Sequence, residues 1–127
     1  MGEYLNFKEE GLKKLNNATV AVVGVGGVGG ICAITLARSG VGTIIIQDFD
    51  KVEESNINRQ IVANYNTIGL YKVDVLEKQI KEINPNCKVD TFAIFYEESN
   101  KDIIFNKNYD YIIDCCDTIK SKEIIIR

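Results

Sequence analysis

A run of glycines near the start of the chain carries the pattern most directly tied to chemistry. Gly24-Val25-Gly26-Gly27-Val28-Gly29 is a G-x-G-x-x-G motif that follows an apolar run and opens a segment of helix-compatible residues. Glycines let the backbone approach a phosphate closely, and a helix N-terminus adds N–H groups and roughly half a unit of positive charge. The motif predicts a nucleotide site at Gly24, Gly26, Gly27 and Gly29, with a tight turn that holds no ligand as the alternative.

A carboxylate follows at the separation that ribose binding requires. Asp48 ends a second apolar run, about 20 residues beyond the motif, where a carboxylate accepts hydrogen bonds from ribose hydroxyls. A solvated aspartate at a strand end is the alternative interpretation. Both NAD and ATP fit this geometry, so the choice between them depends on other residues.

Two cations favour ATP. Arg59 lies in a polar stretch from Phe49 to Asn66, which is longer than the usual strand-to-helix loop of about 2 to 6 residues, and Lys72 follows in the next helix. A triphosphate needs Arg, Lys and magnesium to balance its charge, whereas backbone amides already neutralise a pyrophosphate. We expect ATP with Mg²⁺, and the alternatives are solvated surface cations or an NAD-linked oxidoreductase.

The elements that must position these residues alternate between strands and helices. Buried strands are expected at Thr19 to Val23 and Thr43 to Gln47, because both runs are apolar without alternation. Further strands are expected at Val89 to Phe95 and Tyr109 to Cys115. Helices are expected at Ile31 to Arg38 with Gly40 as C-terminal cap, at Val73 to Ile83 before Asn84-Pro85, and at Ser99 to Phe105, after an amphipathic opening at Phe7 to Leu15.

This alternation predicts an α/β fold with one Rossmann-like domain over residues 1–127. Right-handed crossovers give a mostly parallel sheet of order 3-2-1-4 with helices on both faces. The glycine motif, Asp48 and the Asp114 to Asp117 segment then meet at the carboxyl ends of the strands, where winding reverses. The sheet is expected to be truncated, short of strands beyond the fourth.

Composition narrows the classes of function. The formal net charge of -3 and the pI near 5.0 give no general attraction to nucleic-acid phosphates. Histidine is absent, which excludes Ser-His and Cys-His nucleophiles. The four cysteines lack metal-ligand spacing and indicate reduced thiols, so we expect a cytoplasmic protein that does not enter a membrane.

An ordered series of motifs resembles the ThiF/MoeB/HesA superfamily of ubiquitin-activating-like adenylating enzymes. The series runs through Asp48-Phe49-Asp50-Lys51-Val52, Ser55-Asn56-Ile57-Asn58-Arg59-Gln60, Ile68-Gly69-Leu70-Tyr71-Lys72, Ile83-Asn84-Pro85 and Asp114-Cys115-Cys116-Asp117. It covers the chain from about Phe7 to its last residue and is far more specific than the glycine motif alone. Within the superfamily, the chain is most similar to the tRNA threonylcarbamoyladenosine dehydratase branch.

The resemblance implies adenylation of a carboxylate, with pyrophosphate as the leaving group. It implies that Gly27 packs against the phosphates, that Asp48 binds the ribose, and that Asn56, Arg59 and Lys72 hold the triphosphate. It places Asp117 near magnesium and the α-phosphate. The implied catalytic residues are Arg59, Lys72 and Asp117, and the implied nucleotide contacts are Gly24, Gly26, Gly27, Gly29, Asp48, Asp50, Ser55, Asn56, Asn58, Arg59, Gln60, Lys72 and Asp117.

The acceptor stays open between two partners. In the dehydratase branch it is threonylcarbamoyladenosine in tRNA, and in the ThiF and MoeB branches it is the C-terminal Gly-Gly of a small ubiquitin-like sulfur carrier. Residues 1–23 lack the arginine by which family members reach their partner subunit's triphosphate, and Thr118 follows Asp117 where Asn is usual. A four-strand sheet also exposes apolar surface, which predicts a homodimer.

Two further alternatives follow from the resemblance to this superfamily. The absent arginine is also compatible with a non-catalytic nucleotide-binding remnant that kept the pocket and lost the acceptor site. Cys115 and Cys116 suggest thiol catalysis, since some relatives pass the acyl group to a cysteine. Both thiols end a buried strand, where Cys usually acts as a small apolar residue, so packing is the favoured interpretation.

Overall fold

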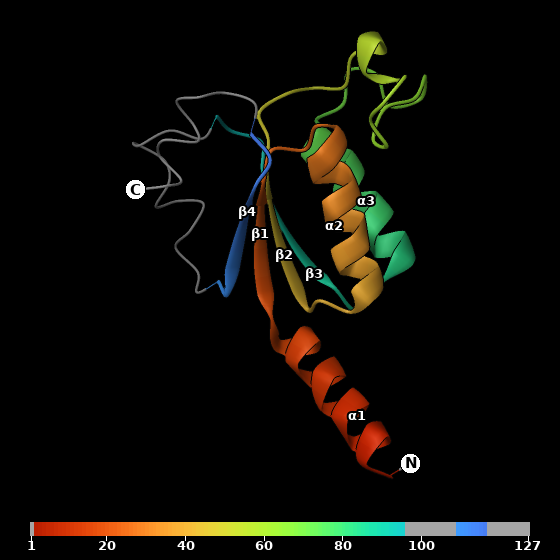
Figure 1. The fold of residues 1–127 in the computed structure, drawn as a ribbon. Coiled ribbons are helices and arrows are strands. Elements are labelled where there is room, and N and C mark those ends of the chain that lie inside the picture. The colour runs from red at the N-terminus through yellow and green to blue at the C-terminus, as the bar shows by residue number, and fades with distance from the viewer. Residues whose placement is uncertain (1, 96–108, 117–127) are drawn as a thin grey trace.

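The computed structural model describes residues 2–95 and 109–116 (Figure 1). The elements are the helix α1 (Gly2–Asn17), the strand β1 (Thr19–Val23), the helix α2 (Gly27–Ser39), the strand β2 (Thr43–Gln47), the short 3₁₀ turn η1 (Glu54–Asn56), the helix α3 (Lys72–Ile83) and the strands β3 (Lys88–Phe92) and β4 (Tyr111–Asp114). The helix expected at residues 99–105 lies outside the described residues.

The four strands form one sheet in the order β3-β2-β1-β4, with every pair parallel. The predicted α/β class and strand order are therefore confirmed. β1 lies at the centre, with Val22 beside both Ile46 of β2 and Ile113 of β4. The loops that follow β1, β2 and β4 consequently meet at one edge of the sheet, as expected of a doubly wound fold.

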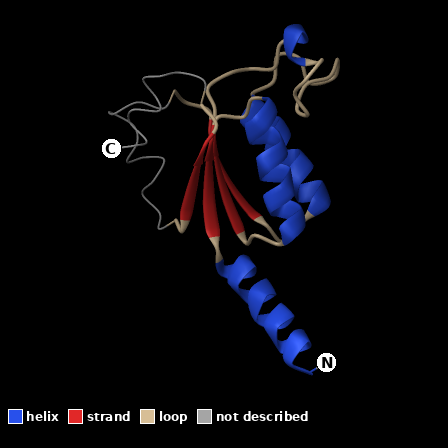
Figure 2. Cartoon of the chain, viewed as in Figure 1, coloured by secondary structure: helices blue, strands red, loops and turns tan. Residues whose placement is uncertain are grey.

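Both faces of the two central strands are buried, as their unbroken apolar sequence predicted. Val22 and Ile46 belong to the larger core, which includes Ala33 of α2 and Leu76 of α3. Figure 2 shows α2 and α3 together on this side of the sheet. On the opposite face, Ala21, Val23 and Ile45 are 1%, 0% and 1% exposed and pack with Phe92, Ile94, Ile112 and Cys116.

Several element ends differ from the expectations. α2 begins at Gly27 rather than Ile31, because glycines of the motif fit where the helix packs closely on the preceding turn. β3 spans Lys88–Phe92 rather than residues 89–95, and β4 spans Tyr111–Asp114 rather than residues 109–115. Their apolar residues are only partly buried, so side-chain pattern marks the ends of these edge strands poorly.

The opening helix extends away from the sheet, at the end opposite the loop between β2 and α3 (Figure 1). It joins the body through its last turn, where the Gly42 N–H donates to the Leu15 carbonyl over 3.0 Å. Leu12 and Leu15 stay 48% and 36% exposed. Among the described residues, no helix combines the length and hydropathy that a bilayer span requires.

Candidate nucleotide site

The glycine loop (Gly24–Gly29) is shaped by contacts that exclude side chains. Gly24 has φ 92°, and a Cβ there would lie 2.7 Å from the Cys115 carbonyl oxygen. A Cβ on Gly29 would lie 1.8 Å from the Gly24 carbonyl oxygen. Gly26 precedes α2 without a capping side chain, so the first N–H groups of the helix point toward whatever lies at its start.

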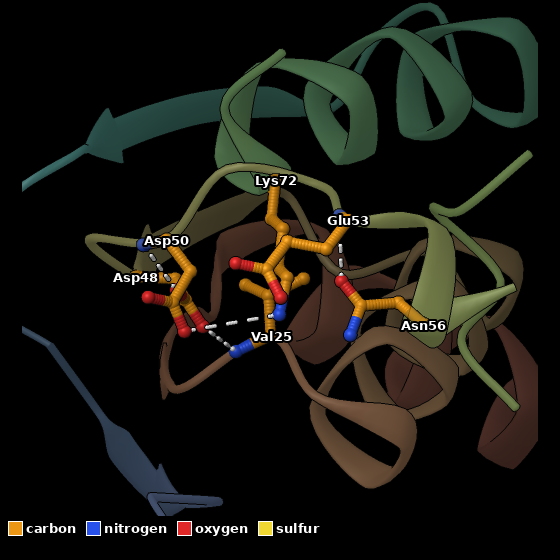
Figure 3. A network of polar contacts seen from close by, with 6 residues as sticks. All are labelled: Val25, Asp48, Asp50, Glu53, Asn56 and Lys72. Atoms are coloured by element: carbon orange, nitrogen blue, oxygen red, sulfur yellow. Dashed lines mark hydrogen bonds and ion pairs between the residues drawn. The ribbon is translucent and has the colours of Figure 1, made fainter. Parts of the chain in front are cut away.

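Asp48 fastens this loop to the end of β2. Its Oδ2 accepts a hydrogen bond from the Val25 N–H over 2.7 Å, and its Oδ1 accepts one from the Asp50 N–H over 2.8 Å (Figure 3). Burial raises the pKa of the Asp48 carboxyl, while the two backbone donors and the charge of Lys72 lower it by less. Each carboxyl oxygen keeps a second lone pair that can accept from a ribose hydroxyl.

Lys72 begins α3 and is buried beside the same carboxylates. Its side chain is 7% exposed, and its Nζ lies 3.8 Å from Asp50 Oδ2. An ammonium at a helix N-terminus opposes the helix dipole, so this position requires an anion nearby. Figure 3 shows the Lys72 side chain directed toward Val25 and the two aspartates.

The crossover loop (residues 48–71) is closed at its base and carries the polar residues. Val52 N–H donates to the Leu70 carbonyl over 2.8 Å, and Lys51 pairs with Tyr71 in an antiparallel bridge. Asn56 is 7% exposed, and its Oδ1 caps η1 by accepting from the Glu53 N–H over 2.8 Å. This capping contact is also visible in Figure 3.

Two neighbours of Asn56 in sequence have different environments. Gln60 is 8% exposed, and its Oε1 has no hydrogen-bond partner in the part of the chain that the structure describes. Arg59 is exposed, and its Nη1 donates to the Ser55 carbonyl over 3.0 Å and to Asn58 Oδ1 over 3.1 Å. These contacts hold the guanidinium on the crossover loop.

A cavity of about 400 Å³ joins the glycine loop to Arg59. It is lined by Gly26, Gly27, Val28, Arg59, Asp114, Cys115 and Cys116. Sequence reasoning placed Gly26, Gly27 and Arg59 in the site but did not single out Asp114, although its place at the end of the fourth strand was the available signal. Asp114 accepts a hydrogen bond from the Cys116 N–H through Oδ1 over 2.9 Å.

Not every predicted residue reaches this cavity. Lys72 does not line it and lies against Asp50, while Ser55 and Asn58 line a separate hollow on the crossover loop. Asp117, the expected magnesium ligand, lies outside the described residues. Within the described part of the chain, no three Cys, Asp or Glu side chains gather as metal ligands.

Comparison with known proteins decides the family. A family model described as the ThiF family matches residues 2–127. The chain belongs to the ThiF family. This membership favours the adenylating interpretation of the glycine loop over the NAD-linked oxidoreductase.

Individual relatives of this ThiF-family chain include two kinds of enzyme. It is 49% identical to the tRNA threonylcarbamoyladenosine dehydratase of Bacillus subtilis (strain 168), over 87% of this chain and 44% of that protein. It is 38% identical to a probable molybdopterin-synthase adenylyltransferase of Gracilaria tenuistipitata var. liui, over 94% of this chain and 34% of that protein.

A solved structure matches the fold closely. The Escherichia coli tRNA N6-threonylcarbamoyladenosine dehydratase in complex with ATP superposes with a TM-score of 0.91 and 37% identity, over 98% of this chain and 51% of that chain. The ThiF-family chain thus spans about half the length, or less, of these relatives.

The surroundings of the two adjacent cysteines that line the cavity do not favour a reactive thiol. Burial first, and then the neighbouring Asp114 carboxylate, raise the pKa of Cys116 to about 12. Cys116 is therefore protonated at neutral pH, and a protonated thiol is a poor nucleophile. Cys115 packs against the glycine loop, with its Cβ 3.3 Å from the position of a Cβ on Gly29. Packing explains both residues better than catalysis.

Proposed function

We propose that residues 1–127 form the ATP-binding half of an adenylating enzyme that activates a carboxylate, with tRNA threonylcarbamoyladenosine dehydratase-like activity as the specific function. The observation that carries the proposal is the cavity shared by the glycine loop and Arg59. The dehydratase structures that this chain resembles include complexes with ATP and with AMP.

In the proposed reaction, the protein aligns and neutralises rather than exchanging protons. The backbone N–H groups at the start of α2 bind phosphate oxygens, and Asp48 accepts from the ribose hydroxyls. Arg59 leaves its carbonyl and amide acceptors to contact the triphosphate, while Lys72 supplies positive charge from beneath the loop. Such alignment and charge stabilisation are the main means of accelerating phosphoryl and nucleotidyl transfer.

The bond changes of the adenylation step balance without an added acid or base. A carboxylate oxygen of the acceptor attacks the α-phosphorus, the bond to the bridging oxygen breaks, and pyrophosphate leaves with its electron pair. The product is an acyl adenylate. In the dehydratase-like reaction, a group within the acceptor attacks the acyl carbon, the bond from that carbon to the AMP oxygen breaks, and AMP leaves. The proton that the attacking group loses on ring closure passes to water.

The proposal includes Mg²⁺, which would bind together with ATP. The Asp114 carboxylate on the glycine-loop cavity fits this cation, because an unaccompanied carboxylate there would repel a triphosphate. Mg²⁺ is bound in such sites by one or two carboxylates together with phosphates and water, so Asp114 and Asp117 would suffice. The ion supplies neutralisation of phosphate charge.

A sulfur-carrier adenylyltransferase is the second candidate. It is favoured by the match to adenylyltransferases, including the adenylyltransferase and sulfurtransferase UBA4 of Vanderwaltozyma polyspora at 40% identity over 86% of this chain. Formation of an adenylate on a carrier protein with a Gly-Gly end, and none on tRNA, would select it. A non-catalytic remnant would bind ATP and form neither product.

The proposal includes a cytoplasmic homodimer. Exposed apolar side chains on two helices, Leu12 and Leu15 of α1 with Ile31 of α2, offer surface for pairing. Sedimentation of the protein at micromolar concentration measures this state, and a monomer at all concentrations contradicts it.

The two cations provide the decisive experiment. Arg59→Ala and Lys72→Ala should each raise the Kd for magnesium-ATP by about 10- to 150-fold, because hydrogen bonds to charged groups contribute about 1.5–3 kcal/mol. Arg38→Ala is the matched control, since Arg38 is exposed in the last turn of α2. Calorimetric titration gives the Kd, and ATP affinity that survives both substitutions rejects the proposed site.

A further inference from the structure

A second hollow lies on the crossover loop and has no part in the proposed phosphate chemistry. It measures about 580 Å³ and is lined by Glu54, Ser55, Ile57, Asn58 and Tyr65. Arg59 connects it to the glycine-loop cavity, because its guanidinium donates to the Ser55 carbonyl and to Asn58 Oδ1. A group held in this hollow therefore lies next to Arg59, which also lines the glycine-loop cavity.

Tyr65 stands out in this hollow because its side chain is exposed on a turn whose backbone is held by hydrogen bonds. The residue is 77% exposed, although Val62 and Ala63 just before it are 0% and 8% exposed. The Asn64 N–H donates to Thr67 Oγ1 over 2.9 Å, and that hydroxyl donates to the Val62 carbonyl over 2.7 Å. A tyrosine presented on a fixed turn loses little conformational entropy when a ligand covers it.

The remaining groups of the hollow define the ligand that would cover this ring. Ser55 and Asn58 offer a hydroxyl and an amide, and Glu54 offers a carboxylate. A carboxylate repels phosphate but accepts from an exocyclic amine. An aromatic face with neutral and acidic hydrogen-bonding groups suits a planar, nitrogen-rich ring, such as a nucleobase. An extended Gly-Gly tail has no ring to stack.

We propose that this hollow is a base-stacking subsite, in which Tyr65 receives an unpaired base of the acceptor RNA beside the adenosine that is activated. The inference rests on the proposed function and specifies it, because it selects a nucleic-acid acceptor over a carrier protein. In this arrangement Arg59 would lie between the stacked base and the triphosphate.

The test compares two exposed tyrosines at opposite ends of the sheet. Tyr65→Ala should weaken binding of a tRNA that carries N6-threonylcarbamoyladenosine by about 5- to 150-fold, which is the range for one base stacked on an aromatic ring. Tyr65→Phe keeps the ring and should retain wild-type affinity. Tyr111→Ala is the matched control, because Tyr111 is 69% exposed at the start of β4, away from the crossover loop.

Binding of tRNA is measured by fluorescence anisotropy, and the Kd for magnesium-ATP is measured separately on each variant. The subsite is supported if Tyr65→Ala is the one variant that loses tRNA affinity and if it keeps its affinity for ATP. Equal tRNA affinity in Tyr65→Ala and Tyr111→Ala overturns it, as does a wild-type protein that binds a Gly-Gly-ended carrier and no tRNA. A wild-type protein that does not bind ATP would instead contradict the proposed function. The tRNA affinities of the variants test the subsite separately from that result.

Discussion

The glycine loop and the crossover loop approach the same cavity by different physical means. The glycine loop is defined by backbone, since Gly24 and Gly29 sit where a Cβ would meet a carbonyl oxygen. The crossover loop is defined by side chains, because Asn56 caps η1 and Arg59 bonds to its own loop. Backbone packing tolerates little change, whereas a loop held by separate polar contacts can lose one and persist.

Gly29→Ala should produce the largest effect on folding. Its Cβ would lie 1.8 Å from the Gly24 carbonyl oxygen, so the loop or the start of α2 must move, and we expect a loss of about 3 kcal/mol or more in unfolding free energy. Urea unfolding measures the loss. Gly11→Ala is the control, because no atom lies within 4 Å of its Cβ and alanine favours the helix. A shared unfolding midpoint for the two variants would contradict the backbone account.

Asp48→Ala should have an intermediate effect because it cuts the link between the two loops. The Val25 and Asp50 N–H groups both lose their acceptor. The buried Val25 N–H left unsatisfied costs about 1–3 kcal/mol, whereas the part-buried Asp50 N–H can bond to water instead. Glu9→Ala, at an exposed position of α1, controls for the loss of a carboxylate. An equal loss in the two variants would show that Asp48 does not fasten the glycine loop.

The same variant predicts a pH dependence with a defined sign. Since burial raises the pKa of Asp48, its proton is held to higher pH in the native protein than in the unfolded chain. The corresponding stability is present below the ordinary pKa of 3.8 and is lost as pH rises through the folded pKa. The gap in unfolding free energy between wild type and Asp48→Ala should therefore narrow as pH rises, and a gap that widens would reverse the assignment.

Asn56→Ala should have the smallest effect of the three substitutions. It removes the contact with the Glu53 N–H, and losing a capping side chain costs about 1 kcal/mol. Asn58→Ala provides the comparison, because Asn58 is exposed and bonds only to the Arg59 guanidinium in the contacts described above. If Asn56→Ala destabilises as much as Gly29→Ala, the two loops do not differ in the way proposed.

The features that depend on local sequence pattern could be predicted from the sequence. β1 and β2 match their predicted bounds because unbroken β-branched runs occur where both faces of a strand are buried. Arg59 was singled out because it is a cation in an overlong loop after a nucleotide motif, and the structure places it on the cavity beside the glycine loop. The ends of β3 and β4 were misplaced because partly buried edge strands leave a weaker pattern.

Features that depend on contacts between residues far apart in the chain could not be predicted from the sequence. Nothing in the pattern around Asp48 indicates that it accepts from Val25, because that bond depends on how the glycine loop turns back over β2. The burial of Lys72 against Asp50 likewise follows from tertiary packing. Motif residues were thus easier to identify than the partners that hold them.

The attachment of α1 through its last turn should affect how fast its backbone amides exchange their protons with solvent. A helix of 16 residues in water is marginal when no neighbouring surface supports it. Among the described contacts, the hydrogen bond from the Gly42 N–H reaches α1 in its last turn, at the Leu15 carbonyl. Its amide protons should therefore exchange with deuterium long before those of β1, by local fraying that leaves the sheet intact. A binding partner that slowed this exchange would reveal itself by protecting those amides alone.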